Sequence, residues 1–105
     1  MEMSLADLKS LLSPVSINHE VPFEVGKSYI IRTVTMTNLG RVVAIKGQFL
    51  ILEDACWVAD SGRYGLALST GVLNEVEVYP HGSFVSIPAI VDAQPWIHQL
   101  PKESK

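Results

Sequence analysis

Five side chains with the chemistry of a binding site fall within eleven positions near the middle of this chain: Asp54, Trp57, Asp60, Arg63 and Tyr64. The two aromatic rings can stack on a base, the guanidinium can pair with a phosphate, and the carboxylates can accept hydrogen bonds from ribose hydroxyls. These residues lie in the stretch 52–71, between two runs typical of β-strands. Because loops on a rigid sheet often carry binding sites, we expect a ligand site here, and its parts suit a nucleotide.

The same residues also fit a structural interpretation. Trp57 would then pack in the core, residues 60–62 would form a turn, and Arg63 would pair with Asp60. The residue types leave both interpretations open.

Arg32 and Arg41 form a second candidate site. They lie on two segments expected to pair across a turn at residues 38–40, with threonines at positions 33, 35 and 37 nearby. Two guanidinium groups beside several hydroxyls can bind an anion such as phosphate. The alternative is a solvated face of the sheet.

Catalytic and metal chemistry have weak support in the sequence. Cys56 is the only cysteine, which excludes an intramolecular disulfide and a cysteine zinc cluster. The three histidines show no metal-ligand spacing, and no glycine-rich phosphate loop is present. We therefore assign no catalytic residue, metal or cofactor. A hydrolase that uses Asp54, Asp60 or His98 ranks third among the functions considered.

The composition describes one small, apolar domain. The chain has 105 residues, 48% of them hydrophobic and 18% charged, with a net charge of −3. This content argues against disorder and leaves apolar surface for a partner or for further copies of the chain. The negative charge argues against binding of long nucleic acid. No apolar run approaches the roughly 18 residues that cross a bilayer. The first residues also lack the positive charge of a signal peptide, so we expect a cytoplasmic protein with no membrane partner.

Hydrophobic patterning predicts a mainly β protein. Strands are expected at residues 28–37, 41–46, 48–53, 72–79, 83–87 and 89–92, with turns at residues 38–40, 46–47 and 80–82 and a break at Pro88. Residues 63–70, followed by Gly71, predict one inserted helical turn with a glycine cap. Together these elements predict a small, strongly bent antiparallel sheet or an SH3-like or OB-like barrel.

Three regions are expected along the chain. Residues 1–26 form a short N-terminal helix and a linker, residues 27–101 form the small β-barrel domain, and residues 102–105 form a frayed tail. The helix is expected to carry an apolar face of Leu5, Leu8, Leu11 and Leu12. Because so short a helix is not stable alone in water, we expect it to dock on the barrel or on a neighbouring copy, and we expect a homo-oligomer.

Four segments carry a resemblance to known proteins: residues 31–35 (Ile-Arg-Thr-Val-Thr), 40–43 (Gly-Arg-Val-Val), 52–64 (from Leu-Glu-Asp to Gly-Arg-Tyr) and 73–77 (Leu-Asn-Glu-Val-Glu). With these segments the chain resembles a family of short, uncharacterised proteins of phages and prophages, over most of residues 27–101. The family supplies no established catalytic residues. Small phage proteins of this size include oligomeric sponges that sequester the nucleotide signals of bacterial immune systems. The resemblance implies such a role in the cytoplasm of an infected bacterium.

We therefore expect a non-enzymatic, homo-oligomeric protein that captures a nucleotide-derived small molecule. Trp57 or Tyr64 would stack on the ligand, and Arg63, Arg32 or Arg41 would bind its phosphates. The alternative is a structural or protein-interaction module, such as a virion component or an inhibitor that binds a host protein through its apolar surface.

Overall fold

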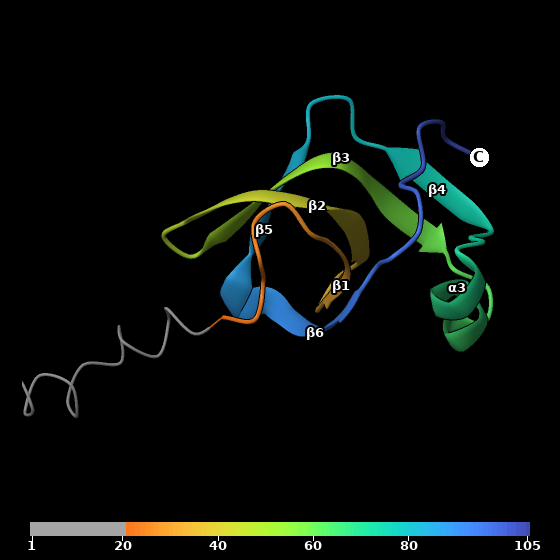
Figure 1. Ribbon diagram of the computed structural model, residues 1–105, viewed down its shortest axis with the longest axis horizontal. Coiled ribbons are helices and arrows are strands. Elements are labelled where there is room, and N and C mark those ends of the chain that lie inside the picture. The colour runs from red at the N-terminus through yellow and green to blue at the C-terminus, as the bar shows by residue number, and fades with distance from the viewer. Residues whose placement is uncertain (1–20) are drawn as a thin grey trace, which may run out of the picture.

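The computed structural model describes residues 21–105, which form one antiparallel sheet of six strands and one α-helix (Figure 1). The expected N-terminal helix and most of its linker lie outside the described residues. In chain order the elements are β1 (Ser28–Thr33), β2 (Thr37–Lys46), β3 (Phe49–Asp60), α3 (Tyr64–Thr70), β4 (Glu75–Val78), β5 (Ser83–Ser86), the 3-10 turn η1 (Ile87–Ala89) and β6 (Ile90–Pro95). The prediction of a mainly β protein with one inserted helical turn is confirmed.

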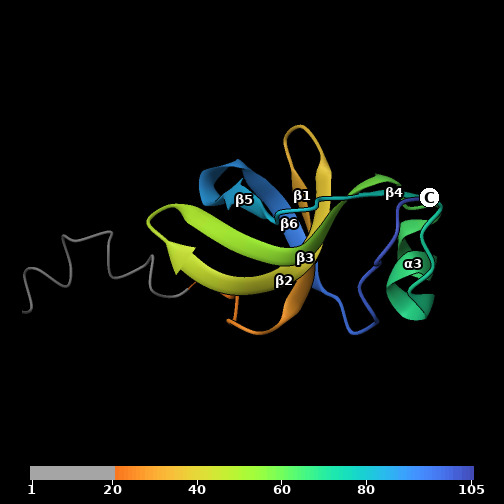
Figure 2. The same ribbon diagram turned by 90° about the horizontal axis from the view of Figure 1, so that it is seen from above.

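The sheet follows the order β4-β3-β2-β1-β6, and β5 also pairs with β3. The long strand β3 pairs with β5 through its first residues and with β4 through its last ones. The sheet is bent but not closed. Figure 2 shows the bent sheet from above, with α3, β4 and the C-terminus at one end and the turn between β2 and β3 at the other.

The bend in β3 coincides with an irregularity in its pairing with β2. The register shifts between Leu39 and Arg41, opposite Glu53 and Cys56. At this point Gly40 approaches Ala55 so closely that a Cβ on the glycine would lie 2.8 Å from the Ala55 Cβ. Asp54 adopts a φ of 50°, a left-handed conformation that aspartate tolerates better than most residues. A bulge of this kind bends a strand and increases its twist.

Strand β1 is buried on both faces, and each face belongs to a different core. Tyr29 and Ile31 belong to one cluster, with residues from β2, β3 and β5: Val42, Leu50, Leu52, Ala55 and Val85. We call this the inner core.

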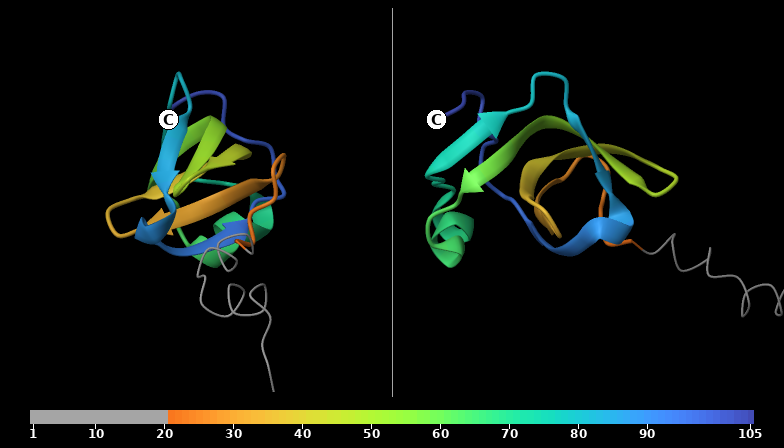
Figure 3. Two further views of the ribbon diagram at one scale, coloured as in Figure 1. Left: turned by 90° about the vertical axis from the view of Figure 1, so that its left-hand side faces the viewer. Right: turned by 180° about the vertical axis from the view of Figure 1, so that it is seen from behind.

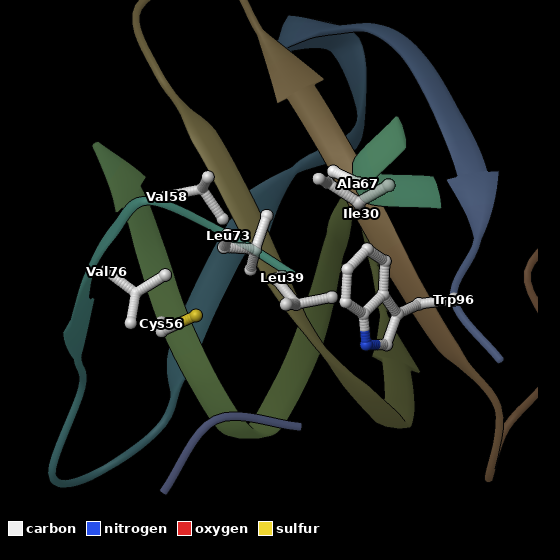
Figure 4. Packing of buried hydrophobic residues seen from close by; sticks show 8 residues of the cluster. All are labelled: Ile30, Leu39, Cys56, Val58, Ala67, Leu73, Val76 and Trp96. Atoms are coloured by element: carbon white, nitrogen blue, oxygen red, sulfur yellow. The ribbon is translucent and has the colours of Figure 1, made fainter. Parts of the chain in front are cut away.

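Ile30 points the opposite way, into a second cluster, here called the helix-side core. Its other members are Leu39, Cys56, Val58, Ala67, Leu73, Val76 and Trp96. Figure 4 shows these side chains gathered over one face of the sheet, with Trp96 beside Leu39 and Ile30. Because both faces of β1 are buried, apolar residues are needed on each side of the sheet. This explains the high apolar content of so small a protein.

Helix α3 covers the helix-side core although it is only seven residues long. Its Ala67 is fully buried, and Tyr64 and Leu68 pack against the same cluster. Gly71 ends the helix in the left-handed conformation, with φ 78°, and its backbone N–H donates to the Ala67 carbonyl at 2.8 Å. The predicted glycine cap is therefore confirmed.

The turn expected at residues 38–40 is wrong, because these residues lie inside β2 and the turn falls at residues 34–36. Thr33 stabilises the true turn, since its Oγ1 donates to the Met36 carbonyl at 3.0 Å and accepts the Met36 N–H at 3.2 Å. Asn38 is buried, and its Oδ1 accepts a hydrogen bond from the Tyr79 hydroxyl at 2.7 Å. An asparagine at this position therefore serves a buried hydrogen bond and does not mark a turn.

The connection expected between the strand at residues 48–53 and the helical turn at residues 63–70 is also wrong for most of its length. Strand β3 continues to Asp60, and only residues 61–63 connect it to α3. Trp57, near the middle of this stretch, pairs with Asn38 on one side and Glu77 on the other. The sequence concealed the strand because three of its exposed residues, Glu53, Asp54 and Asp60, are polar.

Other local predictions agree with the structure. The turn at Gly47, the turn at residues 80–82 and the break at Pro88, which lies within η1, are confirmed. By contrast, the C-terminal residues expected to fray lie along the outer edge of β4. There Val76 and Lys105 exchange backbone hydrogen bonds of 2.9 Å in both directions. Among the described residues, no helix has the length and apolar character that crossing a membrane requires.

Two glycine substitutions test the role of the bend. Gly40→Ala should lower the free energy of unfolding by about 1–3 kcal/mol, because the new methyl group overpacks against Ala55. Gly65→Ala, in α3, meets open space and should raise it by about 0.5–1 kcal/mol. Chemical denaturation of both variants measures the difference. A neutral Gly40→Ala would contradict the account of the bend.

Candidate functional site

The seven residues proposed for a ligand site do not converge on one place. Cross-strand partners share a face of a sheet, so Trp57 lies on the face of Asn38 and Ile31. Tyr64 packs on the opposite face, against the helix-side core. The two aromatic rings proposed to stack on one ligand are therefore separated by the sheet.

Arg32 belongs to a compact network that joins β1, β6 and α3. Its Nε donates to Asp92 Oδ1 at 2.6 Å, and its second nitrogen pairs with Asp92 Oδ2. The guanidinium carbon lies 4.6 Å from the centre of the Tyr64 ring, and the Tyr64 hydroxyl donates to Gln94 Oε1. This two-pronged ion pair with an aromatic contact is a strong arrangement for arginine, and it leaves Arg32 little capacity for a ligand.

Electrostatics within this network agree with its geometry. The hydrogen bonds from Arg32 lower the pKa of Asp92 below the ordinary value of 3.8. The same contact raises the pKa of Arg32. Burial raises the pKa of the Tyr64 hydroxyl, and the nearby Arg32 charge partly offsets that effect. All three groups therefore keep their ordinary ionisation at neutral pH, and the network is an ion pair with a neutral phenol.

Arg41, in β2, lies on the same face of the sheet as Arg32. Its partner in β1 is Ser28, which is four positions from Arg32, or about 13 Å along the strand. Its guanidinium lies 3.0 Å from Asp54 Oδ2 and 3.6 Å from Glu53 Oε2. The two arginines therefore do not form the phosphate platform proposed from the sequence. Two carboxylates around one guanidinium also make the surface at Arg41 unfavourable for an anion.

Asp60 stabilises the connection between β3 and α3. Its Oδ1 accepts the Gly62 N–H at 2.8 Å, and its backbone carbonyl accepts the Asn74 N–H at 3.0 Å. The Asn74 side chain also approaches Asp60 Oδ2 at 3.4 Å. The expected turn at residues 60–62 is present, but the side chain of Asp60 contacts Gly62 and Asn74 and forms no ion pair with Arg63.

Arg63 differs from Arg32 and Arg41, because it forms no ion pair with any described residue. It is exposed at the start of α3, beside a surface depression of about 470 Å³ lined also by Tyr64, Gly65, Leu66 and Ser69. Of the seven predicted residues, Arg63 is the cation that a phosphate could reach without breaking an existing ion pair.

Two groups that could perform covalent or acid–base chemistry, Cys56 and His98, are inaccessible or engaged by other parts of the chain. Cys56 is fully buried, and burial raises the pKa of its thiol to about 11, so the reactive thiolate is rare at neutral pH. A ring nitrogen of His98 lies 2.7 Å from the Leu68 carbonyl, and the ring packs edge-on against Trp96. Residues 21–105 contain no group of three or more His, Cys, Asp or Glu side chains placed to hold a metal ion.

The sequence analysis missed an apolar surface on the outer face of β3 and β5. Phe84 is 71% exposed although it lies inside β5, and Phe49 is 47% exposed. Ile51 lies directly between Phe84 and Ala44, and Phe49 lies between Ser86 and Lys46. We call Phe49, Ile51 and Phe84 the apolar strip. Figure 3 (right) shows β5 on the near side of the sheet, seen from behind.

A signal for the strip exists in the sequence. The runs Phe49-Leu-Ile-Leu52 and Ser83-Phe-Val-Ser86 contain apolar residues at neighbouring positions, and neighbouring side chains of a strand point to opposite faces. Leu50, Leu52 and Val85 fill the inner core. The remaining apolar residues of these runs are therefore left on the outer face.

Comparison with models of known protein families, with curated proteins and with solved structures returns no match for this chain. The phage-family resemblance drawn from the sequence therefore stays a prediction.

The ion pair between Arg32 and Asp92 predicts a specific pH dependence. Because the folded-state pKa of Asp92 is lowered, its contribution is fully present above the unfolded pKa of about 4. It is lost as the pH falls through the lowered folded-state value. Asp92→Asn should therefore lower the melting temperature at pH 7, and its difference from the native chain should close in acid. Melting curves from neutral to strongly acidic pH test this, with Glu77→Gln as an exposed control. A difference that stays constant would contradict the assignment.

Proposed function

We propose that the protein is a non-enzymatic binding module whose working surface is the apolar strip. The observation that carries the proposal is Phe84, a large aromatic side chain that is 71% exposed inside a strand. Contiguous apolar groups on a folded surface mark interaction sites more often than scattered ones do. Aromatic residues at the centre of such surfaces supply much of the binding energy in protein interfaces.

Most of the polar residues predicted for a ligand site already contact other groups of this chain, which supports the same proposal. Arg32, Arg41 and Asp60 each contact groups of this chain. The buried thiol and the engaged imidazole offer no obvious catalytic pair. A module that works through shape and apolar contact needs neither a free cation nor a reactive group. This corresponds to the alternative drawn from the sequence, a structural or protein-interaction module.

The proposal extends to the finer description of the fold. We propose a small barrel of the SH3-like or OB-like kind, supported by the pairing of β6 with β1, the sharing of β3 by β4 and β5, and the 3-10 turn between β5 and β6. Such barrels commonly carry binding surfaces on an otherwise rigid frame. The cytoplasm of an infected bacterium is proposed as the compartment on the basis of the phage resemblance alone.

Site-specific photocrosslinking tests the working surface. Replacing Phe84 by the photoreactive p-benzoylphenylalanine should give a strong crosslinked product on irradiation, because the benzophenone would lie in the contact. The same replacement at Ile97, which is 84% exposed and outside the strip, is the matched control. Mass spectrometry of the product identifies the partner. Equal yields from the two positions, or no product from position 84, would refute the proposed surface.

A second candidate function is capture of a nucleotide-derived ligand, and the unpaired Arg63 favours it. Arg63 lines a surface depression together with Tyr64 and Ser69, residue types that suit a phosphate next to a sugar or a base. Trp57, Arg32 and Arg41 are not part of this version of the site. The sponge role implied by the resemblance belongs here.

Arg63→Ala distinguishes this candidate from the first. A ligand at 100 times its dissociation constant should add about 2.7 kcal/mol of stability to the native chain. Arg63→Ala should lose roughly 1.5–3 kcal/mol of binding with little change in its own melting temperature, because an exposed arginine contributes little to stability. Thermal shift against cyclic nucleotides and ADP-ribose derivatives measures both quantities, with Lys46→Ala as control. Equal shifts in all three proteins would remove Arg63 from the site.

A further inference from the structure

We infer that the free edge of β5, the strand that carries Phe84 of the apolar strip, binds a second copy of this chain by antiparallel pairing with β5 of that copy. This inference rests on the proposed function and names the partner for the same surface. Three features of β5 support this pairing: its free edge, its lack of charge, and the row of side chains that the pairing would complete.

Strand β5 has an unpaired edge among the described residues, since it pairs only with β3. The Ile87 N–H donates to the Gln48 carbonyl at 2.8 Å. In an antiparallel ladder the backbone groups alternate in direction, so Val85 and Ser83 also face β3. The backbone N–H and C=O groups of Phe84 and Ser86 therefore point away from β3, toward the free edge.

The edge of β5 lacks most features that usually prevent pairing. Charged side chains, proline and bulges protect edge strands in soluble proteins. The run Ser83-Phe-Val-Ser86 has no charge and no proline, and its register with β3 is regular. The other outer strands are protected, because Lys105 covers part of the edge of β4, while β6 ends in Pro95 and pairs irregularly with β1.

A second copy fits this edge better than an unrelated strand because the pairing is self-complementary. A two-fold axis through Val85 places Phe84 opposite Ser86 of the second copy, and Ser86 opposite Phe84 of the second copy. Both outward-pointing residues then form hydrogen-bonded pairs. Since β5 carries no charge, two identical edges meet without repulsion between like charges.

The same register extends the apolar strip across the contact. Each row of side chains on the outer face would run Ala44, Ile51, Phe84 and then Ser86, Phe49 and Lys46 of the second copy. The two Phe84 rings would be diagonal neighbours, with Cβ atoms roughly 7–8 Å apart, within reach of aromatic side chains. The two Lys46 side chains would lie at opposite ends of the combined sheet, so the apolar residues occupy its centre.

Two variants of the full chain test the pairing, one on the backbone and one on the side chain. Ser86 has a φ of −69°, which matches proline, so Ser86→Pro should fold normally while it removes the outward N–H. Phe84→Ser removes the exposed ring. Each should weaken self-association at least ~10-fold, as measured by analytical ultracentrifugation across the micromolar range. Ile97→Ser, which removes an equally exposed apolar group elsewhere, should leave association unchanged.

Amide hydrogen exchange of the native chain supplies a second measurement of the pairing. In the native chain the Phe84 and Ser86 amides should exchange more slowly as protein concentration rises, which a merely apolar contact would not produce. A monomer throughout the range, or association that survives Ser86→Pro, overturns the inference. A photocrosslinked product from position 84 that holds a different protein overturns the inference but retains the proposed function. The absence of any product from that position refutes both.

Discussion

The close contact between Gly40 of β2 and Ala55 of β3 is the constraint on which the rest of the structure depends. Because glycine has no side chain, the two strands approach closely at the bulge, and β3 bends there. The bend lets one strand pair with β5 before it and β4 after it. The irregularity also places Leu52 and Ala55, three residues apart, in the same inner core, while Cys56 belongs to the helix-side core.

Long-range polar contacts hold the two cores in register. Arg32 and Asp92, 60 positions apart in the chain, connect β1 to β6 beside the helix. Tyr79 and Asn38, 41 positions apart, connect the end of β4 to β2. These contacts have the residue types of a ligand site but join parts of the fold. Function is therefore better sought where side chains face solvent without partners, at the apolar strip and at Arg63.

Much of the fold could be predicted from local patterns, whereas the site depended on distant contacts. The glycine cap at Gly71 and the turn at Gly47 follow from backbone requirements that a few neighbouring residues express. Asn38 and Gly40 misled the same reasoning, because a buried hydrogen bond to Tyr79 and a close approach to Ala55 produce the composition of a turn. The partners of Arg32 and Arg41 could not be predicted without the strand register. The face on which Trp57 lies depended on the register in the same way.

The burial of β1 on both faces determines the order in which the protein can fold. Ile30 and Ile31 are both fully inaccessible, and the covers for Ile30 include Ala67 and Trp96. A chain emerging from the ribosome exposes β1 long before these residues are available, and its pairing with β6 closes a long loop. Burial of β1 on both faces is therefore complete only when residues as far along the chain as Trp96 have joined the fold.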